Sequence, residues 1–180
     1  MLKWFAQSAF RALIFLTRIS YGIEGMNALL LLMPAKLIVP TLRKFGATIG
    51  EGVIIHSPLI IHNANPDYRN LIIGAHCYLG RGVFLDLKEK IILESRVTLS
   101  MRTTLITHTD AGESRVSEFI RPSSAPVHIH SDAYIGASAT ILQGVEIGEK
   151  AVVGGASLIL KNVAANSIAA GNPAKEITHK

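Results

Sequence analysis

The chain has only one cysteine among its 180 residues, Cys77. A single thiol excludes a disulfide framework and a thiolate-held metal cluster, and it favours the reducing cytoplasm as the location. Charged residues are also sparse, at 17% of the chain against 49% apolar residues, a balance typical of a folded protein and not of a disordered one. We therefore expect one folded body in which Cys77 is a small core residue.

Long uninterrupted apolar segments are missing as well. The most apolar run, residues 28–33, is followed by prolines and a lysine, and it is far shorter than the roughly 20 residues that a membrane-spanning helix needs. A signal peptide would need one continuous apolar core, whereas Arg11 and Arg18 interrupt residues 4–19. The sequence therefore predicts neither a membrane span nor a signal peptide.

The net charge of +5 lies entirely in the first part of the chain. Residues 1–48 contain six basic residues and one acidic residue, and residues 49–180 contain twelve of each. Helical spacing places Lys3, Arg11 and Arg18 on one stripe. A second stripe carries the apolar side chains Phe5, Ala9, Ala12, Leu16 and Ile19. This pattern predicts an amphipathic N-terminal arm over residues 1–48.

Two roles for this arm follow from its amphipathic character. Residues 1–44 could lie on an anionic lipid surface, as basic amphipathic helices do, which would hold the protein at the inner membrane face. Alternatively, the apolar stripe packs on the protein's own body or on a second subunit. No helical reading motif or basic-aromatic pattern is found, so we expect no nucleic-acid partner.

A six-residue repeat defines the rest of the chain. From Ile129 the sequence reads, without interruption, IHSDAY, IGASAT, ILQGVE, IGEKAV, VGGASL and ILKNVA. An α-helix cannot keep residues that are six apart on one face, whereas short strands separated by regular corners can. Three hexapeptides then make one triangular coil of a parallel β-helix. The aliphatic first position and the small fifth position of each hexapeptide point into its narrow interior.

The same register continues upstream with three interruptions. The first positions of the upstream coils are Ile49, Ile55, Ile61, Ile73, Leu79, Leu85, Leu93, Leu99 and Leu105. The interruptions fall at residues 63–70, near residues 88–91, and at residues 109–126, where the longest one predicts a protruding loop. We expect about five coils in a domain over residues 49–180, capped by the N-terminal helix and by the segment after Ala164.

Two segments of this repeat region resemble a known family. They are LITHTD at residues 105–110 and the stretch from YIG at 134–136 through GGAS at 154–157 to GNPAK at 171–175. Residues 49–177 are similar to the hexapeptide-repeat acyltransferases, above all to the sugar and polysaccharide O-acetyltransferases grouped with the maltose, galactoside and xenobiotic acetyltransferases. The resemblance implies a left-handed β-helix, a homotrimer with active sites between subunits, and acetyl-CoA as acyl donor.

His108 is the expected general base. Family members place a histidine at this position, just before a protruding loop. A sugar hydroxyl that attacks a thioester must lose its proton as the bond forms, and histidine is the side chain that titrates nearest to neutrality. The fourth hexapeptide position of His108 should direct its ring away from the core.

By the same resemblance, Asp86 and Tyr134 contact the acceptor, Asp86 by accepting hydrogen bonds from its hydroxyls. Many relatives carry tryptophan where this chain has Tyr134, which puts the fit of the acceptor in doubt. A solvated corner carboxylate is the alternative interpretation of Asp86. The expected acyl acceptor is a sugar hydroxyl in cell-surface polysaccharide synthesis.

The resemblance further implies a groove for acetyl-CoA along the axis of the β-helix. The residues expected to bind the cofactor are Ala137, Gly155, Leu160, Lys161 and Lys175, of which Lys175 would lie near the nucleotide phosphates. Small side chains permit close approach of the backbone, but every coil needs them. The two lysines are therefore the more diagnostic pair.

Other functions remain open. An amino-sugar N-acetyltransferase, an antibiotic-inactivating acetyltransferase and a non-catalytic β-helix scaffold at the membrane surface would all fit the repeat. A γ-class carbonic anhydrase would need two zinc-binding histidines five residues apart on one coil, and no pair here has that spacing. We therefore expect no catalytic metal.

Overall fold

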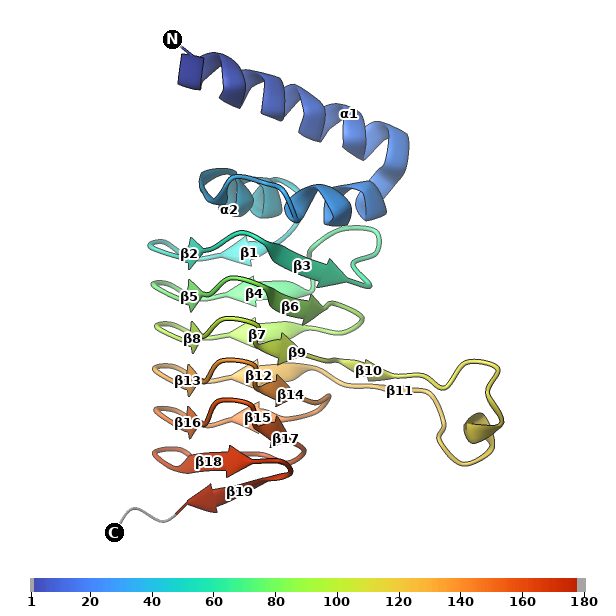
Figure 1. Cartoon of the computed structure of the whole chain (residues 1–180), viewed down its shortest axis with the longest axis vertical. Helices are drawn as coiled ribbons and strands as arrows, with labels where there is room; N and C mark the ends of the chain where they lie inside the picture. The colour runs from blue at the N-terminus through green and yellow to red at the C-terminus, as the bar shows by residue number, and fades with distance from the viewer. Residues whose placement is uncertain (1, 178–180) are drawn as a thin grey trace.

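The computed structural model describes residues 2–177, with side-chain detail for residues 9, 10 and 12–177. Figure 1 shows a column of stacked coils with two helices at one end and a long hairpin projecting from its side. The predicted β-helix of about five coils is confirmed, and its architecture agrees with the left-handed form that the resemblance implies.

Three sheets form the walls of the column, and their neighbouring strands are parallel apart from one terminal pair. The first sheet contains β1 (Thr48–Ile49), β4 (Leu71–Ile73), β7 (Ile91–Leu93), β12 (Val127–Ile129) and β15 (Glu146–Ile147). The second contains β2 (Ile54–Ile55), β5 (Tyr78–Leu79), β8 (Thr98–Leu99), β13 (Tyr134–Ile135), β16 (Val152–Val153), β18 (Ile168–Gly171) and β19 (Ala174–Ile177). The third contains β3 (Leu59–His62), β6 (Val83–Asp86), β9 (Thr104–Leu105), β14 (Thr140–Ile141) and β17 (Leu158–Ile159).

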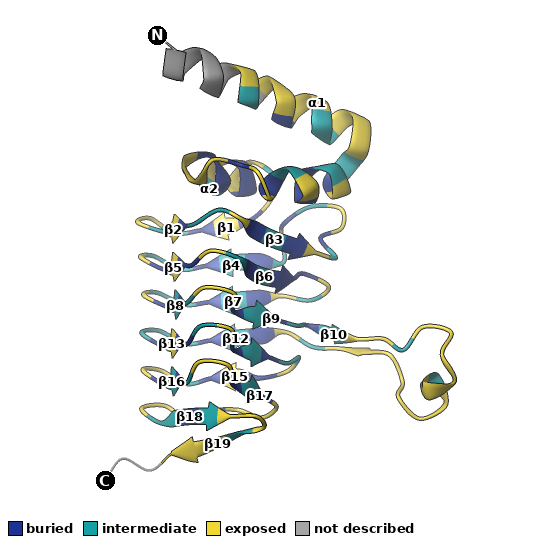
Figure 2. Ribbon diagram, in the orientation of Figure 1, coloured by how far each residue is buried: buried dark blue, intermediate teal, exposed yellow. Residues whose placement is uncertain are grey.

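The hexapeptide register accounts for the core. Every first position named above is buried, as are the fifth positions from Ala133 to Val163 and the thiol of Cys77. Glycine at the second position lets the coils approach each other, since a Cβ on Gly136 would lie 2.5 Å from the backbone nitrogen of Gly155. Figure 2 colours parts of the stacked strands as buried and many of the corners between them as exposed, in line with this pattern.

The predicted loop over residues 109–126 does leave the column. It carries the antiparallel pair β10 (His108–Thr109) and β11 (Ser123–Ser124), with a short 3₁₀ helix, η1 (Arg115–Glu118), near its tip. Figure 1 shows this hairpin extending away from the third sheet, at the junction between the third and fourth coils. The hairpin places His108 at its base.

Two helices precede the first coil. Helix α1 (Leu2–Leu30) is kinked at Gly22, and after a tight turn α2 (Ala35–Lys44) leads into the column. Met26 and Leu30 beyond the kink are fully buried, so the second half of α1 covers the first coil as predicted. In the part of the chain that the structure describes, no helix is long and apolar enough to cross a membrane.

The first half of α1 does not pack the predicted apolar stripe on the body of the protein. Leu16 and Ile19 of the predicted apolar stripe are 59% and 67% exposed, and Ala9 and Ala12 are exposed as well, whereas Ile14 is buried. Packing of this stripe on the protein's own body is therefore wrong for these residues, because the Gly22 kink turns the helix away from the column (Figure 2). The side chains of Lys3, Phe5 and Arg11 lie outside those described.

Candidate active site

His108 lies where the third sheet passes into the projecting hairpin. Its Nδ1 atom is 2.6 Å from an oxygen of Asp86, which ends strand β6 on the preceding coil. The His108 side chain is partly open to solvent, and that of Asp86 is closed off from it. The pair therefore couples an inner carboxylate to an accessible imidazole.

The Asp86 carboxylate is held by several donors. One oxygen accepts from the backbone N–H of Thr107 at 2.8 Å and from its hydroxyl at 3.1 Å, and the other accepts from the Asn63 amide at 2.8 Å. Burial alone would raise the pKa of Asp86, but the hydrogen bonds from His108, Asn63 and Thr107 outweigh it and lower that pKa. Asp86 is thus an ionised, acceptor-only group.

This arrangement assigns the tautomer of His108. An ionised carboxylate can only accept, so the Nδ1 atom facing Asp86 carries the proton and Nε2 is left as the basic nitrogen. Asp86 has an exposed fraction of 1%, and its carboxylate is directed at His108 and Thr107. Its burial also contradicts the alternative interpretation as a solvated corner carboxylate.

A pocket of about 310 Å³ opens beside His108. Its walls come from the two strands of the hairpin and from the corner after β6, with Lys88, Thr109, Asp110, Pro122, Ser123 and Ser124 around the histidine. A group bound in this pocket would lie next to the ring of His108.

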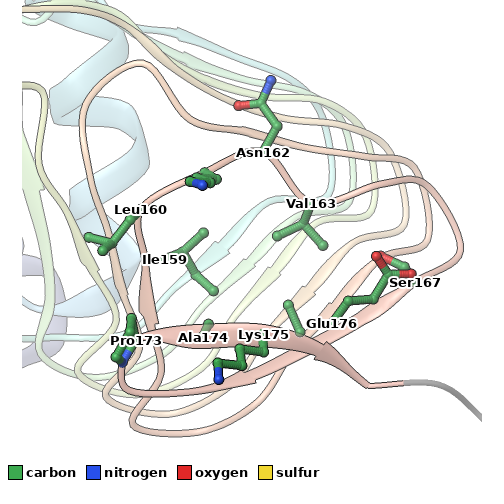
Figure 3. Close-up of a pocket in the computed structure, with 11 residues that line it drawn as sticks. Ile159, Leu160, Asn162, Val163, Ser167, Pro173, Ala174, Lys175 and Glu176 are labelled. Carbon is green, nitrogen blue, oxygen red and sulfur yellow. The ribbon is translucent and has the colours of Figure 1, made fainter.

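Three of the five expected cofactor residues share a second pocket. Leu160, Lys161 and Lys175 line a cavity of about 410 Å³ at the C-terminal end of the column (Figure 3). Its floor includes the inward side chains of Ile159 and Val163, because no further complete coil covers them. This pocket offers two ammonium groups around an apolar surface.

The strand register relates this pocket to His108. The backbone N–H of Ile106 donates to Ile141, and that of Leu142 donates to Ile159, so residues 106, 142 and 160 stack on successive coils. Ile106 precedes His108 by two residues. With about 4.8 Å between neighbouring strands, Leu160 lies roughly 10 Å from Ile106 along the axis of the column. The second pocket and His108 therefore lie on the same edge of the column.

Ala137 and Gly155 lie at a different edge. They follow β13 and β16, where the second sheet passes to the third, and the Ala137 carbonyl accepts from the N–H of Ala156 at 2.8 Å. Neither residue lines the pocket of Leu160 and Lys161. The expected cofactor residues thus form two groups on opposite edges of the third sheet.

Tyr134 is also separate from the base. It points outward from the second sheet, is 46% exposed, and its hydroxyl accepts a hydrogen bond from Ser100 at 3.0 Å. It does not line the pocket at His108 within one chain. Only a second subunit could bring a Tyr134 side chain to that pocket.

Asn63 and Thr107 were not expected at the site. Asn63 comes two residues after the inward Ile61, and Thr107 comes two residues after the inward Leu105. Asp86 ends β6, the strand that lies between β3 and β9 in the third sheet. Aligning the coils by their hexapeptide register would have placed these polar residues side by side. The hexapeptide register can be followed in the sequence, but it is interrupted at Asn63, so the alignment of Asn63 with the next coils is not evident.

Comparison with known proteins supports the architecture. A family model described as "Hexapeptide repeat of succinyl-transferase" matches residues 126–160. The match covers about a fifth of the chain and falls within the uninterrupted part of the six-residue repeat. A 2,3,4,5-tetrahydropyridine-2,6-dicarboxylate N-acetyltransferase of Staphylococcus aureus is 40% identical to this chain over 70 residues, 39% of the chain. The chain spans only 29% of the length of that relative.

Solved structures show the same fold at low sequence identity. A hexapeptide-repeat acetyltransferase of Vibrio cholerae O1 biovar eltor, complexed with acetyl-CoA, has a TM-score of 0.73 at 21% identity and covers 89% of this chain and 90% of its own. A galactoside acetyltransferase in complex with coenzyme A has a TM-score of 0.58 at 23% identity, with 81% and 72% covered. AntD, an N-acyltransferase from Bacillus cereus, has a TM-score of 0.61 at 20% identity, with 74% and 72% covered.

Proposed function

We propose that this protein transfers an acetyl group from acetyl-CoA to the hydroxyl of a sugar, with His108 as general base. The observation that carries the proposal is the His108–Asp86 pair beside a pocket at the base of the hairpin. The sugar acceptor rests on the sequence resemblance, and the donor is supported by structural neighbours crystallised with acetyl-CoA or coenzyme A. Synthesis of a cell-surface polysaccharide is the setting that the resemblance suggests.

The chemistry of His108 follows from its tautomer. Acetyl-CoA would supply the activated acyl group. Nε2 of His108 takes the proton of the attacking hydroxyl as the new C–O bond forms, and the same proton passes to the sulfur when the C–S bond breaks. Asp86 keeps the ring in position and stabilises the imidazolium that exists between these two transfers.

We place the acyl donor along the edge that joins Lys161 and Lys175 to His108. The two ammonium groups suit the phosphates of a nucleotide, and the rise of roughly 10 Å across two coils suits an extended thiol arm. Because Ala137, Gly155 and Tyr134 lie elsewhere on the chain, we infer that they complete the groove from the neighbouring subunit of a homotrimer.

Calorimetric titration with acetyl-CoA tests the transferase class. We expect saturable binding by the wild-type protein and weaker binding by the variant with both Lys161→Ala and Lys175→Ala. Thiol release in the presence of sugar acceptors then tests the reaction. Absence of binding at millimolar acetyl-CoA would contradict the proposal and favour a non-catalytic scaffold.

An amine acceptor is the second candidate. It is favoured by the curated match to an N-acetyltransferase and by the structural likeness to the N-acyltransferase AntD. An amine must be unprotonated to attack, so the rate of N-acetylation would follow the pKa of the acceptor amine, a dependence that a hydroxyl acceptor lacks near neutral pH. Measuring rate against pH with matched hydroxyl and amine sugars distinguishes the two, and drug resistance on expression would indicate an antibiotic acceptor.

We also propose that α1 contacts an anionic lipid surface. The described half before the kink exposes Leu13, Phe15, Leu16, Ile19 and Tyr21, and the first 48 residues carry a net charge of +5. An apolar face on a basic helix is the combination that binds at the interface of anionic membranes. This contact would hold a cytoplasmic enzyme peripherally at the inner membrane face.

Vesicle flotation tests the lipid contact. Binding to phosphatidylglycerol vesicles, little binding to phosphatidylcholine vesicles, and loss of binding with Leu16→Ser plus Ile19→Ser are expected. Leu32→Ser is the control, because Leu32 is also exposed but lies beyond the kink. If the double variant keeps its vesicle binding but loses its oligomeric state, the exposed face is a subunit contact instead.

A further inference from the structure

Glu94, His128 and His130 form a cluster on the outer surface of the first sheet, which does not belong to the His108 site. Glu94 follows β7, His128 lies within β12, and His130 follows β12. The register pairs Ile129 with Leu93, so Glu94 and the two histidines face one another across neighbouring coils. Both coils are part of the rigid column, which fixes the three side chains on one surface.

The potential ligand atoms of the cluster converge. An oxygen of Glu94 lies 3.1 Å from Nε2 of His128 and 2.9 Å from Nδ1 of His130, and one atom from each residue fits within 4.8 Å of the others. The two rings lie 4.1 Å apart between centroids and 31° from parallel. The three groups are therefore within the reach of a single ion.

Ser131 orients the carboxylate from the other side. The second oxygen of Glu94 accepts from the backbone N–H of Ser131 at 3.0 Å and from its hydroxyl at 2.9 Å. Hydrogen bonds to a carboxylate from behind are the support that metal-binding carboxylates require. The first oxygen is left to face the histidines.

The carboxylate of Glu94 and the two imidazoles are the ligands of a typical zinc site with one coordination position left for water. Two imidazoles and one carboxylate bind Zn²⁺ in a tetrahedral arrangement whose fourth ligand is water. The side chains are 28–37% exposed, so an ion and its water can reach them. Binding would need only that each histidine carry its proton on the nitrogen facing away from Glu94.

We propose that Glu94, His128 and His130 bind a divalent transition-metal ion, with Zn²⁺ as the best fit. The ion would join the third and fourth coils at the junction where residues 109–126 leave the column, and so stabilise the pairing of β7 with β12. The proposal does not depend on acyl transfer and leaves the expected metal-independent chemistry of His108 unchanged. The spacing of histidines along one coil does not reveal a site whose ligands come from two neighbouring coils.

Zinc titration of the whole chain, after dialysis against a chelator, tests the site. Calorimetry should give one Zn²⁺ per chain, and the melting temperature should rise with added zinc. His128→Ala and Glu94→Gln should each weaken zinc binding by at least about tenfold, because even residues that only support a ligand contribute that much. Binding of Co²⁺ should give the visible absorption bands of a tetrahedral site.

His76→Ala is the matched control. His76 is an exposed histidine near a carboxylate, 4.0 Å from Glu51, but it has no second histidine beside it among the described clusters. Its replacement should leave zinc binding unchanged. No stoichiometric zinc binding, or equal losses in the His76 and His128 variants, would overturn the proposal. Glu94→Gln keeps the size of the side chain, so the test does not depend on how well the alanine variant folds.

Discussion

Nδ1 of His108 and an oxygen of Asp86 lie 2.6 Å apart although 22 residues separate them in the chain. One coil of the β-helix brings them together, because β6 and β9 are neighbours in the third sheet. The buried carboxylate holds the Nδ1 side of the imidazole, and His108 also lines the pocket at the hairpin. The stacking of coils therefore fixes the orientation of the His108 ring.

Replacing His108 with alanine should remove most of the activity. A positioned general base contributes roughly 10² to 10⁴ in rate, so kcat should fall by at least about 100-fold. Steady-state thiol release measures it, and circular dichroism checks that the column is intact. His62→Ala is the control, since its ring lies 6.5 Å from that of His108 without hydrogen bonding to it. A loss in kcat smaller than about tenfold would remove His108 from the role of base.

Asp86→Asn should impair catalysis through His108. The Asn amide carries no negative charge, so it cannot stabilise the imidazolium. It can also donate a hydrogen bond to Nδ1, so the tautomer with the proton on Nδ1 is no longer favoured. We expect kcat to fall by roughly 10² or more, with little change in the KM for acetyl-CoA, and the acidic limb of the pH–rate profile to shift. An acceptor-binding role would instead raise the KM for the sugar and leave the pH profile in place.

The same variant should alter how stability depends on pH. The pKa of Asp86 is lowered in the folded state, so its contribution to the free energy of unfolding is complete above the unfolded pKa near 4 and is lost as the pH falls toward the folded pKa. Urea unfolding should show wild type more stable than Asp86→Asn at pH 7, with a difference that shrinks below about pH 4. A difference that stays constant down to pH 3 would mean that Asp86 is not the group responsible.

The sequence predicts the column better than it predicts the site. Inward residues such as Ile129 and Leu105 repeat every six residues, and burial in a narrow prism permits little else at those positions. Handedness came only from the family resemblance, since periodicity is the same for either hand. The exposed face of α1 was not predictable, because it depends on a single backbone kink at Gly22.

The role of Asp86 illustrates what the sequence hides. Its interpretation as an acceptor contact came from family resemblance, whereas its hydrogen bonds to Thr107 and His108 depend on which coils are adjacent. The separation of Gly155 from Lys161 has a similar origin. The groove that we propose between subunits would have one side on each of two chains, so its two sides would lie on different edges of a single column.

The last prediction concerns Lys161 and Lys175, which share a pocket at the C-terminal end of the column. A hydrogen bond to a charged group contributes about 1.5–3 kcal/mol, so losing both ammonium groups should weaken acetyl-CoA binding by at least about tenfold. If the lysines only hold the nucleotide, the KM for the donor should rise while kcat at saturating donor stays nearly unchanged. Lys150→Ala removes another exposed ammonium, one that already pairs with Glu149, and should change neither constant. Equal effects of the Lys150 variant and the double variant would indicate general electrostatic attraction, and the donor would then have to bind elsewhere than along the edge that leads to His108.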